Sequence, residues 1–323
     1  MSQSTIRKRS KRNDNTANNT NAPTAEQQQQ QPKQQFGGIS IWSRLIHRFI
    51  MLCMVWGGMY LFYFKQADHD QNRLMASVSD NIVDVPLIQE LPCSDHYVQE
   101  RTEFPKCAPI RCGRFVGDSI VDEHETMELR LLAETVFGIS QPSGGVAIFD
   151  LASGALSNGT KFVNLWHLVK KRKNNLISKK SLDTFHIVKN KVIHNLAIQF
   201  GISPDQIHLT KPVFFTRITD APAATLNDQY WHPHVDKVTY GTFVYTSLLY
   251  LSTYGNEFKG GRFFFLDNKR NVTIEPKFGR ISAFTSSSEN QHMVEQVDSG
   301  ARFALTIPFT CDKSQAVNIP TID

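Results

Sequence analysis

The spacing of apolar positions changes near residue 206. Before it, residues 123–137 and 181–201 carry apolar side chains at helical spacing, and each segment ends at a glycine. From 206 to 309, apolar and polar positions alternate over short runs separated by Gly and Pro, which predicts several strands. We therefore expect a mainly β protein with flanking helices (α+β), in which a helical section precedes a jelly-roll.

These patterns divide the folded part of the chain into three regions. Residues 116–205 form the helical part of the predicted domain, 206–312 form the jelly-roll, and 313–323 form a C-terminal tail. Residues 65–115 contain four prolines and little periodicity, so we interpret them as a stem.

The N-terminal 64 residues have a different composition. Residues 1–44 are rich in Asn, Gln, Thr and Ser and cannot bury enough apolar surface to fold, so they predict a disordered cytosolic tail. Residues 49–64 carry no charge, and residues 45–64 together approach the ~20 residues that span a bilayer. We expect a transmembrane helix over 45–64, since a cleaved signal peptide would start closer to the N-terminus.

Charge around this segment predicts its orientation. Basic residues dominate the N-terminal flank, whereas Asp68 and Asp70 follow it. The positive-inside rule then gives a single-pass type II signal-anchor, with a cytosolic N-terminus and a C-terminal domain in the lumen of the endoplasmic reticulum or Golgi.

The net charge does not indicate a nucleic-acid partner. The whole chain carries a formal charge of +5. Eight basic and two acidic residues give positions 1–48 a charge of +6, which leaves −1 for the remainder. The predicted domain is therefore nearly neutral, and no broad phosphate-binding surface is expected.

Cysteines and sequons fit a secretory compartment. Four cysteines follow the apolar segment, an even number that predicts disulfides in an oxidising environment, although the sequence leaves three pairings open. Two Asn-x-Thr sequons, at Asn158 and Asn271, predict glycosylation on the lumenal side. The cysteines are Cys93, Cys107, Cys112 and Cys311.

A candidate metal site lies in the β-rich region. His234 and Asp236 are two residues apart, so on a strand they would point to the same face, and His292 would join them through the fold. Two imidazoles and one carboxylate suit non-haem Fe(II), although zinc accepts the same donors. His232 also points that way on a strand, and a His-x-His pair would indicate a different kind of metal site.

The surrounding motifs resemble a known family. His-x-Asp at 234–236 is followed by Gly-Gly at 260–261, Pro-x-x-Gly at 276–279, His292, and Arg302 ten residues later. This order is similar to that of the 2-oxoglutarate- and iron(II)-dependent oxygenases, in the prolyl 4-hydroxylase-like branch. The resemblance covers roughly residues 210–310 and implies a double-stranded β-helix.

The same resemblance implies the site. His234, Asp236 and His292 would bind Fe(II), and the forked guanidinium of Arg302 would bind the distal carboxylate of 2-oxoglutarate. Because Asp236 stands at the family's carboxylate position, we interpret His232 as a non-ligand. The expected activity is an O2-dependent dioxygenase reaction that forms succinate and hydroxylates a second substrate, with a protein side chain favoured and L-ascorbate keeping the iron reduced. Tyr230, Tyr240 and Tyr245 could also reach the co-substrate, but aromatic residues in strands are usually core residues.

Two other functions are compatible with parts of this pattern. A catalytically silent lumenal interaction module could retain the fold, but it has no need for all four site residues. A zinc hydrolase would need a general base beside the metal, and the sequence around 232–236 supplies no Glu there. Metal identity and oxygen dependence would distinguish the three hypotheses.

Overall fold

The computed structural model describes residues 41–69, 72–172, 176–268 and 270–322. Most of the predicted N-terminal tail lies outside these ranges. The chain divides into two units, 1–61 and 62–323. In the first unit the described residues belong to one helix, α1 (Ile41–His69), which continues into the second unit.

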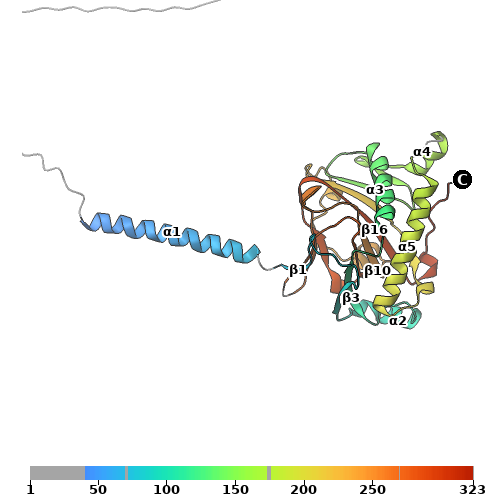
Figure 1. Ribbon diagram of the computed structural model, residues 1–323, viewed down its shortest axis with the longest axis horizontal. Helices are drawn as coiled ribbons and strands as arrows, with labels where there is room; N and C mark the ends of the chain where they lie inside the picture. The colour runs from blue at the N-terminus through green and yellow to red at the C-terminus, as the bar shows by residue number, and fades with distance from the viewer. Residues whose placement is uncertain (1–40, 70–71, 173–175, 269, 323) are drawn as a thin grey trace, which may run out of the picture. The chain divides into compact units, whose positions relative to one another are not determined.

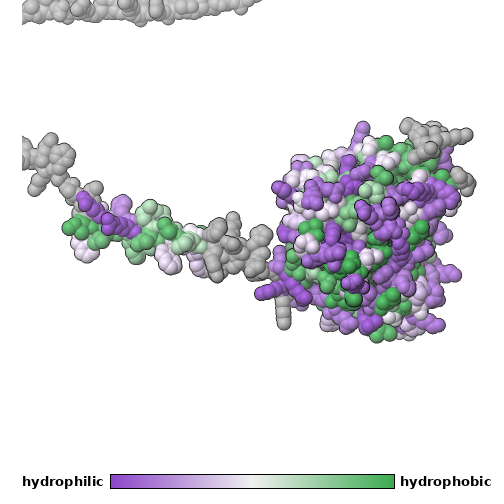
Figure 2. All heavy atoms as spheres, viewed as in Figure 1, coloured by the Kyte–Doolittle hydropathy of each residue, from purple (hydrophilic) through white to green (hydrophobic). Residues whose placement is uncertain are grey.

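Helix α1 contains the segment predicted to cross a membrane. Figure 2 shows apolar residues along it, with hydrophilic residues towards its N-terminal end, where Arg44 and Arg48 lie. In the described part of the chain, no helix is both long enough and apolar enough to span a bilayer. The transmembrane and signal-anchor predictions are therefore not supported. The uncharged run has only 16 residues, against the ~20 that a span requires.

The second unit contains two β-sheets and a layer of helices (Figure 1). The larger sheet has twelve strands, and its main order is β2-β3-β14-β10-β16-β9-β5-β6-β4. The smaller sheet has the order β1-β13-β12-β15. This arrangement is consistent with the expected jelly-roll core of an α/β protein.

The strands and helices have the following bounds. The strands are β1 (Arg73–Ala76), β2 (Leu87–Leu91), β3 (Cys112–Gly117), β4 (Gln141–Pro142), β5 (Val146–Asp150), β6 (Ala155–Gly159), β7 (Lys161–Asn164), β8 (His208–Leu209), β9 (Phe214–Thr219), β10 (Tyr245–Tyr250), β11 (Phe258–Gly260), β12 (Phe263–Phe265), β13 (Val272–Ile274), β14 (Ile281–Thr285), β15 (His292–Val294) and β16 (Val297–Thr310). The remaining α-helices are α2 (Val98–Glu103), α3 (Glu123–Gly138), α4 (Leu165–Arg172), α5 (Lys179–Phe200) and α6 (Asp236–Tyr240).

Local sequence explains why the two long helices form where predicted. Asp122 accepts a hydrogen bond from the backbone of Glu125, and the Glu125 side chain accepts one from the backbone of Asp122, a complete capping box at the start of α3. Helix α5 ends at Gly201, which has a φ of 69° and closes the helix in the left-handed conformation. The apolar faces of α3 and α5 pack against the larger sheet and form the main hydrophobic core.

A second core lies between the two sheets. It is built from apolar residues of β3, β10, β12, β13, β14 and β16. The segment 65–115, interpreted from sequence as a stem, contributes to both sheets: β1 pairs with β13, and β2 pairs with β3. Arg280 is fully buried, and its Nη1 donates to the carbonyl oxygen of Ser77 at 2.9 Å, which fastens this segment to the sheets.

The structure selects one of the three possible cysteine pairings. Cys93 is bonded to Cys112, and Cys107 is bonded to Cys311. The second bond joins the loop between α2 and β3 to the residue directly after β16. Asn158 is exposed near the end of β6 and Asn271 is partly buried before β13, and their glycosylation stays a prediction.

Candidate active site

Three predicted ligand residues meet in a cavity of the jelly-roll. One donor atom from each of His234, Asp236 and His292 lies within 4.8 Å of the others. Asp236 Oδ1 is 3.6 Å from the Nε2 atoms of both histidines. The cavity has a volume of about 400 Å³, and Arg302 also lines it.

The residues converge by a different route from the one that the sequence suggested. His234 forms a single antiparallel bridge with His292, whereas Asp236 is the first residue of the short helix α6. The expectation that His234 and Asp236 share a face of one strand is therefore wrong. Val235 is the last extended residue, with φ −120° and ψ 119°, so the chain turns between the two side chains and still brings them to one point.

Both imidazoles turn Nε2 towards this point. Nδ1 of His292 lies 2.8 Å from the carbonyl oxygen of Asn290, and Nδ1 of His234 lies 3.1 Å from that of His232. A carbonyl oxygen only accepts, so each neutral ring carries its hydrogen on Nδ1 and leaves the Nε2 lone pair free. Such backbone contacts are typical of metal-binding histidines.

An aromatic cage holds His292 in its neutral form. The ring of Phe284 lies 4.9 Å away and that of Phe263 lies 5.1 Å away, measured between centroids. Burial lowers the pKa of His292 to about 4, which outweighs the attraction of Asp236 for the charged form, and the neighbouring His234 lowers it further. The sequence did not indicate that the phenylalanines at 263–265 pack around a histidine.

Arg302 is a buried cation without an anionic partner among the described residues. Its Nε donates to the carbonyl oxygen of Gly261 at 2.9 Å, but its buried Nη2 has no hydrogen-bond partner. Burial lowers the pKa of the guanidinium, and nearby Tyr250 and Tyr230 partly oppose that effect. A buried charge of this kind needs a partner, and a carboxylate matches its geometry.

Tyr250 was not singled out from the sequence. Arg302 lies 5.6 Å from the centre of its ring, and the Tyr250 hydroxyl is buried near Ser282 without a hydrogen bond of normal geometry. Tyr250 therefore packs behind the Arg302 guanidinium, and Arg302 is the one of the two that lines the cavity. The sequence signal was weak, because Tyr250 lies in an apolar strand and resembles a core residue.

The tyrosines considered from sequence have different roles. Tyr245 donates to the carbonyl oxygen of Cys107 at 2.6 Å and is a core residue. Tyr230 and Tyr240 line the cavity, and the Tyr230 hydroxyl accepts a hydrogen bond from the backbone of Val297 at 2.7 Å. Burial raises the pKa of Tyr240 to about 12, and Asp236 adds to that effect. His232 also lines the cavity but is exposed and contacts Gln229, in agreement with its interpretation as a non-ligand.

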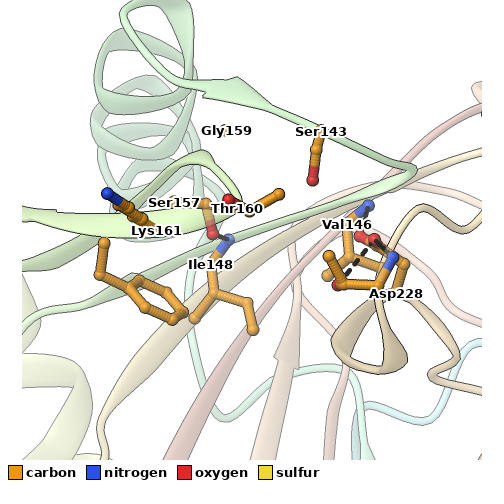
Figure 3. A pocket seen from close by; sticks show the side chains of 10 residues that line it. Ser143, Val146, Ile148, Ser157, Gly159, Thr160, Lys161 and Asp228 are labelled. Carbon is orange, nitrogen blue, oxygen red and sulfur yellow. Dashed lines mark hydrogen bonds between the residues drawn. The ribbon is translucent and has the colours of Figure 1, made fainter.

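A small hollow shares Val146 and Ile148 with the cavity and has Asp228 in its wall. Figure 3 shows this hollow and the contacts of Asp228. Asp228 accepts hydrogen bonds from the backbone of Val146 on β5 and from the backbone and hydroxyl of Thr225. Gly144 permits this approach, since a Cβ there would lie 2.5 Å from the carboxylate. The Asp228 carboxylate is fully engaged in holding the loop.

Comparison with known proteins identifies the family. Residues 222–309 match the 2OG-Fe(II) oxygenase superfamily. Over 291 residues the chain is 42% identical to the 2-oxoglutarate and iron-dependent oxygenase domain-containing protein 3 of Xenopus tropicalis, covering 90% of this chain and 91% of that protein. The chain belongs to the 2OG-Fe(II) oxygenase superfamily. It is a 2-oxoglutarate-dependent dioxygenase, as the motif order implied.

Other known proteins are also similar to this oxygenase. The human protein of the same name is 46% identical over 231 residues, which cover 72% of each chain. Human prolyl 3-hydroxylase 1 is 28% identical over 223 residues, 62% of this chain and 28% of that one. The prolyl hydroxylase of Trichoplax adhaerens, solved with a hypoxia inducible factor peptide, is 13% identical, covers 68% of this chain and 90% of its own, and has a TM-score of 0.42.

Proposed function

We propose that this oxygenase binds Fe(II) through His234, Asp236 and His292 and binds 2-oxoglutarate through Arg302, in order to hydroxylate an uncharged side chain of a protein substrate. The observation that carries the proposal is the buried guanidinium of Arg302, which lines the same cavity as the three-residue cluster and has no anionic partner among the described residues. A silent interaction module has no physical reason to keep a buried, unpaired cation next to two neutral imidazoles and a carboxylate.

The donor set fits the iron that the family uses. Two neutral imidazoles and one carboxylate form the ligand set of non-haem Fe(II) oxygenases. Bound iron would supply the redox chemistry that couples consumption of O2 and 2-oxoglutarate to hydroxylation of a C–H bond. The residues of the chain hold the metal, orient the co-substrate through Arg302, and keep the site enclosed in apolar side chains.

Charge in the cavity favours a neutral substrate group. Asp236 is the one carboxylate among the described residues that line the cavity, and the proposal assigns it to the metal. A lysine ammonium entering the site would therefore find no counter-charge, and its desolvation would be costly. The substrate side presents aliphatic, aromatic and threonine side chains, such as Ile148, Phe214 and Thr239. Of proline and lysine, proline is therefore the more compatible hydroxylation target.

The cysteines support a lumenal working compartment as part of this proposal. Two disulfides support an oxidising environment, such as the lumen of the secretory pathway. Peptide segments of secretory proteins are thus the proposed substrate class. L-Ascorbate is the reductant expected to keep the iron in its active state.

The test uses the full chain with Fe(II), 2-oxoglutarate and ascorbate. Matched synthetic peptides differ only in a central proline or lysine, and succinate release and peptide mass are both measured. The proposal predicts that proline peptides accelerate succinate release and gain one oxygen atom. Hydroxylation of the lysine peptides alone would contradict the assignment of a neutral substrate.

A further inference from the structure

The two oxygens of the Asp236 carboxylate have different surroundings. Oδ1 faces the two histidines, at 3.6 Å from each Nε2. Oδ2 accepts a hydrogen bond of 2.6 Å from the hydroxyl of Thr246 on β10. The Asp236 side chain is 4% exposed, and so is held mainly by these contacts with the protein. The chain therefore already distinguishes the oxygen that faces the imidazoles from the one that does not.

A second hydroxyl continues this contact. Thr246 Oγ1 lies 2.8 Å from the Ser286 hydroxyl at the end of β14, and both side chains are buried. A threonine has one hydroxyl hydrogen, and an ionised carboxylate only accepts. Thr246 therefore donates to Asp236, and Ser286 must donate to Thr246. This direction polarises the Thr246 hydroxyl and strengthens its bond to the carboxylate.

We propose that Thr246 and Ser286 are positioning residues that restrict Asp236 to metal binding through Oδ1 alone. The inference rests on the proposed iron site. A carboxylate that offered both oxygens would occupy an additional position on the metal, which the co-substrate and O2 need. With Oδ2 committed to Thr246, Asp236 supplies a single donor in a fixed orientation. Hydrogen bonds to ligating carboxylates commonly have this effect.

The contacts separate the role of the hydroxyls from support of the fold. The backbone carbonyl of Ser286 accepts a hydrogen bond from the backbone of Lys237 at 2.9 Å, which holds α6 in place. Replacement of the Ser286 side chain leaves this bond intact. Thr246→Val retains the size and branching of the side chain and removes only the donor. The two substitutions therefore change the carboxylate contact with little change in packing.

The experiment measures Co(II) binding to the full chain, with Co(II) as an oxygen-stable probe for Fe(II). Thr246→Val is expected to weaken binding at least about tenfold and to change the visible spectrum of the bound Co(II), since the coordination number would change. Thr246→Ser keeps the donor and should restore most of the affinity and the original spectrum. Ser286→Ala should cause a smaller loss, because Thr246 can still donate.

The control is Ser247→Ala on the same strand. The Ser247 hydroxyl is fully buried without a partner, and strand alternation directs it away from Thr246. This variant should bind Co(II) like the unmodified chain. Wild-type affinity and spectrum in Thr246→Val would overturn the inference. If Thr246→Val does not fold, an unchanged Co(II) affinity in Ser286→Ala would overturn the proposed effect of the hydrogen bonds from Ser286 to Thr246 and from Thr246 to Asp236. Failure of the unmodified chain to bind Co(II) would instead overturn the proposed metal site.

Discussion

His234 and His292 are joined by two backbone hydrogen bonds although 58 positions separate them in the sequence. The His234 N–H donates to the carbonyl of His292 at 2.9 Å, and the His292 N–H donates to the carbonyl of His234 at 3.0 Å. Their ring centroids are 4.3 Å apart. The backbone bridge therefore brings the two imidazoles together.

This bridge makes the histidine side chains separable from the fold. We predict that His292→Ala folds normally but lowers iron-dependent succinate formation more than about 100-fold, since even residues that only support a metal ligand commonly contribute 10–100-fold. Circular dichroism and succinate assays check both parts. Normal turnover in the variant would refute the assignment of His292 as a ligand.

The buried His292 also predicts a pH dependence for the metal-free protein. Its pKa is lowered from 6.5 to about 4 in the fold, so between these values the unfolded chain takes up a proton that the folded chain refuses. The free energy of unfolding should therefore fall as pH drops from 6.5 towards 4. Urea titrations at several pH values measure how the free energy of unfolding changes with pH. In His292→Leu this change should be smaller, by an amount equivalent to the uptake of up to about one proton on unfolding. An identical slope in both proteins would contradict this prediction.

Substitution of Arg302 should change the concentration of 2-oxoglutarate that the enzyme requires. Arg302→Gln should raise the half-saturating concentration of 2-oxoglutarate at least about 30-fold, since loss of the charged partner of a buried carboxylate costs about 2 kcal/mol or more. Arg302→Lys should give a half-saturating concentration between those of the unmodified chain and Arg302→Gln, because lysine keeps the charge and loses the forked donor geometry. Succinate formation as a function of 2-oxoglutarate concentration measures both. An unchanged requirement in Arg302→Gln would exclude this role.

Gly261 links the Gly-Gly motif to Arg302. At Gly261, φ is 65°, and an added Cβ would lie 2.9 Å from Val297 and 3.2 Å from Cδ of Arg302. Gly261→Ala should lower the free energy of unfolding by about 1–3 kcal/mol and also raise the 2-oxoglutarate requirement. Gly255→Ala is the control, since its φ is 81° and its Cβ would meet open space. Equal co-substrate requirements in the two variants would show that Gly261 does not position Arg302.

The disulfide between Cys107 and Cys311 predicts a stability difference. It encloses a sequence separation of 204 residues and holds the end of β16, the strand that carries Arg302. The double variant Cys107→Ser and Cys311→Ser should lose about 3–5 kcal/mol of unfolding free energy. Denaturant titrations of the variant and the oxidised protein measure the loss. Equal midpoints would show that the bond adds no stability.

The sequence predicts those parts of the site that depend on residue type. The spacing of His234, Asp236, His292 and Arg302 indicated which side chains meet, because few chemistries use that set in that order. Helices α3 and α5 were predictable because their apolar spacing and end residues act locally. The disulfide pairing required the fold, since each pairing is compatible with the same four positions.

Contacts between distant segments were not accessible to sequence patterns. A single bridge between His234 and His292 leaves no periodic signal in the sequence. Helix α6, which follows Val235, has five residues and is too short to show helical spacing. Tyr250 and Thr246 lie in a fully buried strand, where their side chains resemble core residues. The segment 65–115 seemed unstructured because β1 and β2 are short and depend on pairing with distant strands.

The central claim is that this chain activates O2 at the His234, Asp236 and His292 cluster. The most direct measurement is succinate formation by the full chain with Fe(II), 2-oxoglutarate, ascorbate and air, compared with Asp236→Ala under the same conditions. The account predicts iron- and oxygen-dependent succinate from the unmodified chain and none above background from the variant. Equal succinate formation by the two proteins would contradict it.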